Sequence, residues 1–112
     1  MLLSEKVRVE IFIPDLPDSS YSRLLMQLET ELSYTFGGCT VISADGKFRS
    51  GAGLILPDKV NILFTDASFD LKRDRLIVGQ YVDRVRAAIE TALANEESIL
   101  VAIYPVLHAQ TE

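Results

Sequence analysis

The side chains best suited to covalent or acid–base chemistry are scarce in this chain of 112 residues, which has one cysteine, Cys39, and one histidine, His108. A cysteine becomes an effective nucleophile when a base lies within hydrogen-bond reach of its sulfur. Cys39, Asp66 and His108 stand at the ends of predicted strands that meet at one end of a sheet. In the strand order predicted below, however, three strand spacings, or roughly 14 Å, separate Cys39 from His108. The sequence therefore predicts no catalytic residue, unless a second copy supplies the histidine.

Carboxylates collect near the predicted loops, where their oxygens could hold a hard cation such as Mg²⁺ or Ca²⁺. The competing interpretation is that Asp18, Asp70 and Asp74 stand where helices begin and meet the positive end of the helix dipole. The sequence has no metal-ligand spacing, and one histidine cannot build a zinc site. We therefore expect no metal and no cofactor. The cations Lys72, Arg73 and Arg75 could receive an anion at the start of the second helix; solvated surface charge is the alternative.

The composition is that of one globular domain spanning residues 1–112, with 48% apolar and 24% charged residues. A net charge of −5 argues against nucleic acid, because phosphate binding needs a clustered excess of Lys and Arg. No apolar run reaches the roughly 18 residues of a membrane span. The first residues do not resemble a signal peptide. We therefore expect a soluble, cytoplasmic protein that binds neither nucleic acid nor membrane.

Hydrophobic periodicity predicts a strand from Val7 to Pro14 and then a helix that begins after Asp18 or Ser19. The helix is indicated by apolar residues at three- and four-residue steps, namely Tyr21, Leu24, Leu25, Leu28 and Leu32. Gly37-Gly38 should end this helix, because glycine enters the left-handed cap conformation without a side-chain penalty.

The second half of the chain repeats the strand-then-helix pattern. Cys39 to Ala44 is predicted as a strand, Asp45-Gly46 as a tight turn, and Lys47 to Arg49 as a short arm that pairs back. A loop or irregular edge follows as far as Asp58. Lys59 to Thr65 is the next predicted strand, and Ile99 to His108 is the last. Between them lies a second helical stripe, which begins near Asp70 or Asp74 and comprises Val78, Tyr81, Val82, Val85, Ala88, Ile89, Ala92 and Leu93.

The resulting order, β-α-β-β-α-β, is typical of a ferredoxin-like α+β sandwich. In this fold an antiparallel sheet with strand order 4-1-3-2 carries two helices on one face. Pro105 fits this arrangement, because proline removes a ladder donor and therefore favours an edge strand. A differently ordered α+β sheet is the alternative.

Such a sheet leaves one face open. If the predicted helix-facing set is Val7, Val9, Ile11, Ile13, Val60, Ile62, Phe64, Val101 and Ile103, the open face holds Arg8, Glu10, Phe12, Asn61, Leu63, Thr65, Leu100, Ala102, Tyr104 and Val106. A contiguous apolar patch usually marks a contact surface. We therefore predict a homo-oligomer, a dimer or higher, with interface residues Phe12, Leu63, Leu100, Tyr104 and Val106. Alternatively, the loop from Ala44 to Asp58 or a chain end folds over this face. Aromatic residues on a sheet can also stack RNA bases, but that needs a basic surround.

Within residues 34–53, Phe36-Gly37-Gly38-Cys39-Thr40 is followed by Gly46, Phe48, and Gly51 or Gly53. This pattern resembles one in small bacterial and phage proteins of ferredoxin-like order. Phe48 stands where tryptophan is common in that pattern. The motif also has a plain structural cause, namely a helix cap at Gly37-Gly38, a strand start and a tight turn at Asp45-Gly46. The resemblance implies the fold and no agreed activity.

Two functions follow as hypotheses. The first is a non-catalytic binding or regulatory module, a homo-oligomer that uses the open sheet face and the 44–58 loop, with a protein partner as a further expectation. The second is a cofactor-free enzyme, monooxygenase- or isomerase-like, with an apolar pocket between the sheet and the helices. Its predicted ligand-binding residues are Tyr21, Asn61, Asp66 and Tyr81. Because the sequence offers no clustered acid–base pair, the first hypothesis is favoured.

Overall fold

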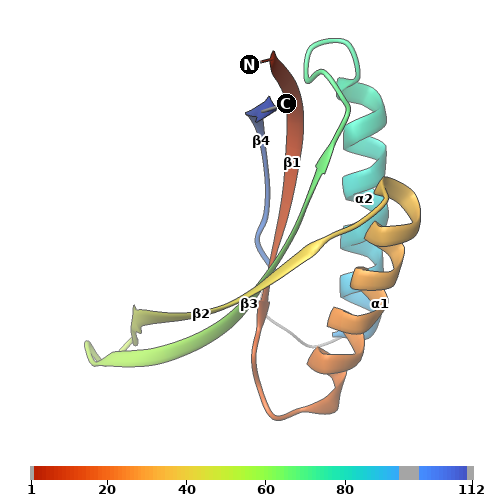
Figure 1. The fold of residues 1–112 in the computed structure, drawn as a ribbon. Helices are drawn as coiled ribbons and strands as arrows, with labels where there is room; N and C mark the ends of the chain where they lie inside the picture. Colours follow the sequence, from red (N-terminus) through yellow and green to blue (C-terminus); the bar gives the residue numbers. More distant parts are fainter. Residues whose placement is uncertain (1, 94–98, 111–112) are drawn as a thin grey trace.

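The computed structural model describes residues 2–93 and 99–110, and their elements follow in the predicted order. These are β1 (Leu2–Pro14), α1 (Ser19–Phe36), β2 (Thr40–Arg49), β3 (Ile55–Ala67), α2 (Arg75–Ala92) and β4 (Val101–Gln110). The β-α-β-β-α-β order is therefore confirmed. The strands form one antiparallel sheet in the order β2-β3-β1-β4, which is 4-1-3-2 when it is read from the β4 edge. Both helices lie on the same side of this sheet (Figure 1).

Local sequence explains where α1 begins and ends. The Asp18 side chain accepts a hydrogen bond from the Ser20 amide at 2.8 Å, which satisfies one of the free donors of the first turn. At the other end Gly37 has φ of +90° and donates its amide to the Ser33 carbonyl. That left-handed cap is the conformation expected for glycine at this position.

The core lies between the helices and one face of the sheet. β1 contributes Val7, Val9, Ile11 and Ile13, which alternate with residues of the opposite face. The two helices contribute the predicted apolar stripes, whose fully or almost fully buried members are Tyr21, Leu24, Leu28 and Leu32 from α1 and Val78, Tyr81, Val85 and Ile89 from α2. Leu93 extends the second stripe just beyond α2.

The tight turn predicted at Asp45-Gly46 is wrong. Both residues lie inside β2, where Asp45 pairs with Lys59 and Gly46 with Asp58. The chain instead reverses between Ser50 and Leu54, where Gly53 has φ of +84° and donates its amide to the Ser50 carbonyl. An Asp-Gly pair favours a turn only locally, and the continuous β2–β3 register overrides it here. The irregular segment expected before Asp58 is consequently strand, from Ile55 onward.

The β2–β3 hairpin extends well past the rest of the sheet. β1 pairs with β3 only as far as Val60, which lies opposite Pro14. Residues 45–59 beyond this point, which we call the arm, project away from the helices and from β1 (Figure 1). The arm makes the molecule elongated, with dimensions of 49 × 28 × 23 Å and a radius of gyration of 15.7 Å. A compact chain of this length would have a radius of gyration of about 13 Å.

The predicted orientation of β3 is also wrong. The set of side chains that faces the helices is shifted by one residue from the predicted set. Leu63 and Thr65 are buried beneath the helices, whereas Ile62 and Phe64 point to the open face. Because Ile62, Leu63 and Phe64 are all apolar, the two-residue period of this strand does not indicate which set faces the core. The cross-strand pairing decides it, since Leu63 lies opposite the buried Ile11. The Thr65 hydroxyl is satisfied there by donating to the Gly38 carbonyl at 2.8 Å.

Candidate functional site on the open sheet face

The open face carries a compact group of polar side chains centred on Arg8 of β1. In register, Arg8 lies opposite Asp66 of β3 on one side and Tyr104 of β4 on the other. The Arg8 guanidinium donates to both carboxylate oxygens of Asp66, from Nε at 2.7 Å and from Nη2 at 2.9 Å. This bidentate geometry is the stronger form of an arginine–carboxylate pair.

Asp66 also holds the single histidine of the chain. His108 Nε2 lies 2.7 Å from Asp66 Oδ2, so one carboxylate bridges the guanidinium and the imidazole. The Arg8 hydrogen bonds are the main cause of a lowered pKa for Asp66, and His108 adds to this effect. The same hydrogen bond raises the pKa of Arg8. The Asp66 carboxylate is therefore ionised at neutral pH and orients the imidazole, as carboxylates commonly do for functional histidines.

A second pair completes the group, which we call the polar cluster: Arg8, Glu10, Asp66, Tyr104 and His108. The Tyr104 hydroxyl donates to Glu10 Oε1, and this bond raises the pKa of Tyr104. Ser4 lies opposite His108 in the β1–β4 register. Its hydroxyl oxygen is buried without a hydrogen-bond partner among the described residues. The cluster thus contains an oriented histidine, an acid and a phenol on one surface.

An apolar patch adjoins the polar cluster on the same face. Phe12 lies between Ile62 of β3 and Leu100, whose carbonyl accepts from the Phe12 amide at 3.0 Å. Ile42 of the edge strand β2 lies opposite Ile62 and is 46% exposed. The Arg8 guanidinium stacks 4.3 Å from the centre of the Phe64 ring, which joins the two regions. We call Phe12, Ile42, Ile62, Phe64 and Leu100 the apolar patch.

The predicted interface set is therefore altered by the structure. Phe12, Leu100, Tyr104 and Val106 lie on the open face, where they remain predicted interface residues. Leu63 is wrong as an interface residue because it is fully buried in the core. Ile62 and Phe64 lie on the open face instead.

The predicted ligand-binding residues do not come together. Asp66 belongs to the polar cluster on the open face. Tyr21 and Tyr81 are core residues of the helices, 6% and 4% exposed. Asn61 is on the helix-facing side of β3, and its amide oxygen accepts from the Ser43 hydroxyl at 3.2 Å. The space between sheet and helices, where these residues would share a pocket, is instead filled mainly by leucines and isoleucines of the core.

Tyr81 has one unusual feature. Its hydroxyl oxygen is buried without a hydrogen-bond partner among the described residues, and burial raises the pKa of Tyr81 to about 12. The ring packs edge-to-face on Phe36, with 4.9 Å between ring centres, and carries the Arg84 guanidinium 5.4 Å from its centre. A surface groove of about 540 Å³ runs past these side chains and Phe69.

The sequence places Asp66 and His108 at the same end of the sheet, but it does not indicate that their side chains meet across β1. Cys39 is in fact held by Ser33 Oγ and the Glu29 carbonyl, each 3.6 Å from its sulfur. The position of Arg8 between the apolar residues of β1 indicates that it lies on the open face, where a carboxylate on the neighbouring strand is a favourable partner. Tyr104 and His108 are four residues apart in β4, so their side chains lie on the same face of the sheet.

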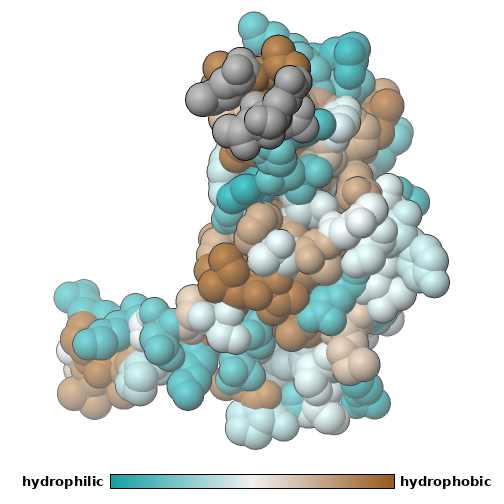
Figure 2. Space-filling model, in the orientation of Figure 1, coloured by the Kyte–Doolittle hydropathy of each residue, from teal (hydrophilic) through white to brown (hydrophobic). Residues whose placement is uncertain are grey.

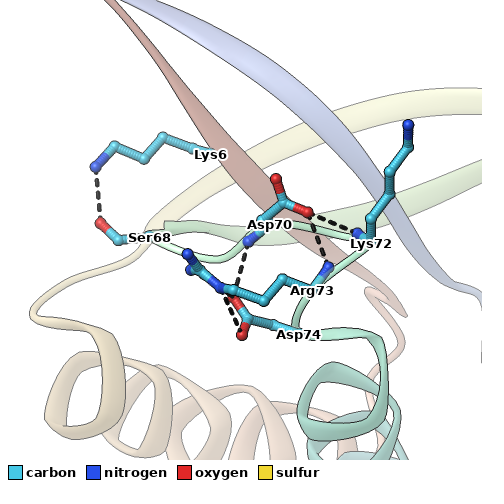
Figure 3. Close-up of polar contacts among 6 residues, drawn as sticks. All are labelled: Lys6, Ser68, Asp70, Lys72, Arg73 and Asp74. Carbon is cyan, nitrogen blue, oxygen red and sulfur yellow. Dashed lines mark hydrogen bonds and ion pairs between the residues drawn. The ribbon is translucent and has the colours of Figure 1, made fainter.

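The segment before α2 contains a separate polar group (Figure 3). Asp70 Oδ1 accepts from the amides of Lys72 and Arg73, and Asp74 Oδ2 accepts from the Asp70 amide. Arg73 pairs with Asp74 at 2.9 Å. Asp74 is the residue at the helix start, but its side chain makes no cap hydrogen bond. These contacts shape the turn into α2 and occupy the carboxylates with backbone amides. Among the residues that the structure describes, no group of three or more potential metal ligands is found.

The chain matches no known family model, no curated protein and no solved structure. Within residues 2–93 and 99–110, no helix is long and apolar enough to cross a membrane.

Proposed function

We propose that this protein is a homo-oligomeric binding module in which two copies cover one another's open sheet faces. The observation that carries this proposal is an excess of exposed surface. The chain exposes 7786 Å², whereas a compact monomer of this mass exposes about 6,200 Å². The difference, about 1,600 Å² for one chain, is larger than the roughly 800 Å² that each partner contributes to a standard stable interface.

The distribution of apolar side chains supports the same proposal. The helices bury their apolar stripes on one face, while none of the described elements covers the apolar patch on the other. Exposed apolar residues continue along the arm, which Figure 2 shows as a projection with both polar and apolar surface. Ile42 and Leu100 of the apolar patch are exposed, and its other members are partly exposed. A contiguous apolar patch on a protein surface usually marks a protein contact. The long hairpin does not fold back over it (Figure 1).

The experiment is light scattering coupled to gel filtration over a range of protein concentrations. We expect the wild type to have twice the mass of one chain and Ile42→Asp to have the mass of one chain. Ile42 lies on an edge strand and is half exposed, so the substitution leaves the core intact. Met26→Asp is the matched control, because Met26 is 66% exposed on α1, outside the open face. A monomeric wild type at every concentration would refute the proposal.

The second candidate is a cofactor-free enzyme, and the Asp66–His108 pair is the observation that favours it. An imidazole oriented by a carboxylate can transfer protons, and coverage by a second copy would shield it from water. Its active site would be the polar cluster, on the side of the sheet away from the helices. The test follows the His108 ring resonances while small enolisable ketones are added, with His108→Gln to assign them. Unperturbed resonances would remove this candidate.

A further inference from the structure

We infer that the arm of one copy lies across the open sheet face of the second copy. This inference rests on the proposed function, because it names the element that covers the face. Its starting point is the burial of the arm. Apart from the half-buried Ser50, every residue from 45 to 59 is exposed. An isolated two-stranded hairpin is only marginally stable in water, so a strand pair of this length needs a surface to pack on.

The arm has apolar side chains to place on such a surface. Phe48 is 49% exposed and pairs with Leu56, which is 37% exposed. Leu54 and Ile55 at its tip are each 62% exposed. Because side chains alternate along a strand, Phe48 and Ile42 of β2 have the same parity, as do Leu56 and Ile62 of β3. The arm therefore continues the apolar patch of its own sheet on one side.

The length of the arm matches the width of the face that it would cover. From Val60 to Ile55 the strand advances about 17 Å at the usual rise per residue. Three spacings between neighbouring strands of the four-stranded sheet amount to about 14 Å. With a two-fold axis beside the apolar patch, each arm would reach over the partner's β1 and β4, and the two contacts would be equivalent.

The side of the arm that would dock is apolar. Phe48 pairs with Leu56 on this side, whereas Lys47, Arg49 and Lys59 lie at the alternate positions of β2 and β3 and point to the other side. The apolar patch of a second copy is therefore the surface that this side of the arm matches. Pro57 further restricts the mode of contact. It removes a backbone donor from β3 where β1 no longer pairs with it, which disfavours strand addition along that edge. The arm can therefore dock through the side chains on its faces and not through its backbone edge.

The test is selective disulfide formation between two variants, both made in a Cys39→Ser background. One population carries Leu56→Cys in the arm and the other carries Phe12→Cys in the apolar patch. After mixing and mild oxidation, we expect the mixed Leu56→Cys/Phe12→Cys dimer to exceed both homodimers by at least several-fold. Met26→Cys, exposed on α1, replaces Phe12→Cys as the control and should give no such excess.

A second measurement keeps this inference separate from the proposed function. The double variant Phe48→Glu/Leu56→Glu changes only exposed arm residues, and we expect it to elute as a monomer with unchanged circular dichroism. A dimeric double variant without the mixed cross-link would overturn the inference, although the faces could still associate by another route. A monomeric wild type would overturn both proposals.

Discussion

The imidazole of His108 lies 2.7 Å from the carboxylate of Asp66, although β4 and β3 are not neighbours in the sheet. β1 runs between them, and the contact passes over its open face beside Arg8. A single carboxylate therefore links all three strands at one end of the sheet. Asp66 side-chain exposure is 13%, so these bonds are shielded from much of the competition by water.

Asp66→Asn should lower the free energy of unfolding at neutral pH by about 1–3 kcal/mol, as expected for hydrogen bonds to charged groups. The substitution leaves the half-buried Arg8 guanidinium without its ion partner. Urea denaturation followed by circular dichroism measures the change. Asp58→Asn is the control, because Asp58 is an exposed arm residue, and its effect should be within about 0.5 kcal/mol. Equal effects of the two substitutions would contradict the role given to Asp66.

The lowered pKa of Asp66 also predicts how stability depends on pH. The folded carboxylate holds its proton less tightly than the unfolded one, whose pKa is about 3.9. The contribution of Asp66 is therefore fully present above that unfolded value and is lost as pH falls through the lower, folded pKa. Wild-type stability should decline more steeply below about pH 4 than that of Asp66→Asn. Parallel curves for the two proteins would show that Asp66 contributes nothing to acid sensitivity.

The sequence was sufficient for the element order because each element has its own signal. The two helices have clear apolar stripes, and Gly37 and Asp18 mark the ends of α1. The arm could not be predicted, because an Asp-Gly turn signal competes with strand pairing, and only the pairing of distant residues settles the outcome. The polar cluster depends on the same kind of information. Arg8 and Asp66 are separated by 58 positions, and their contact requires a definite β1–β3 register.

Two glycines provide a matched test of the cap at the end of α1. Gly37 has φ of +90°, so Gly37→Ala should destabilise the protein by about 1 kcal/mol or more through backbone strain. Gly79 lies within α2, and an added Cβ would meet nothing within 4 Å. Gly79→Ala should therefore stabilise the protein by about 0.5–1 kcal/mol, because alanine is the better helix former. Thermal unfolding would show shifts of opposite sign, and shifts of the same sign would contradict the cap assignment.

Tyr81→Phe should leave stability unchanged or increase it. The substitution removes a buried hydroxyl that has no hydrogen-bond partner among the described residues and keeps the ring that packs on Phe36. An unsatisfied buried polar group costs about 1–3 kcal/mol, so its removal relieves a penalty. Urea denaturation measures the effect, and alkaline spectrophotometric titration should lose the tyrosine that ionises at about pH 12. A clear loss of stability would mean that the hydroxyl has a partner in solution.

Leu63 and Ile62 test the orientation of β3, because their side chains are similar in size and point to opposite faces of the sheet. Leu63 is fully buried, so Leu63→Ala should cost about 2–5 kcal/mol from lost burial and the cavity that remains. Ile62 lies on the open face opposite Phe12, so truncating it removes contact surface and leaves the core packed. Ile62→Ala should therefore destabilise the monomer less than Leu63→Ala does and weaken self-association more. Denaturation at low protein concentration measures the stability of the monomer, and light scattering at higher concentration measures self-association. The reverse pattern would place Leu63 on the contact surface and Ile62 in the core, which would refute both the β3 register and the apolar patch defined by it.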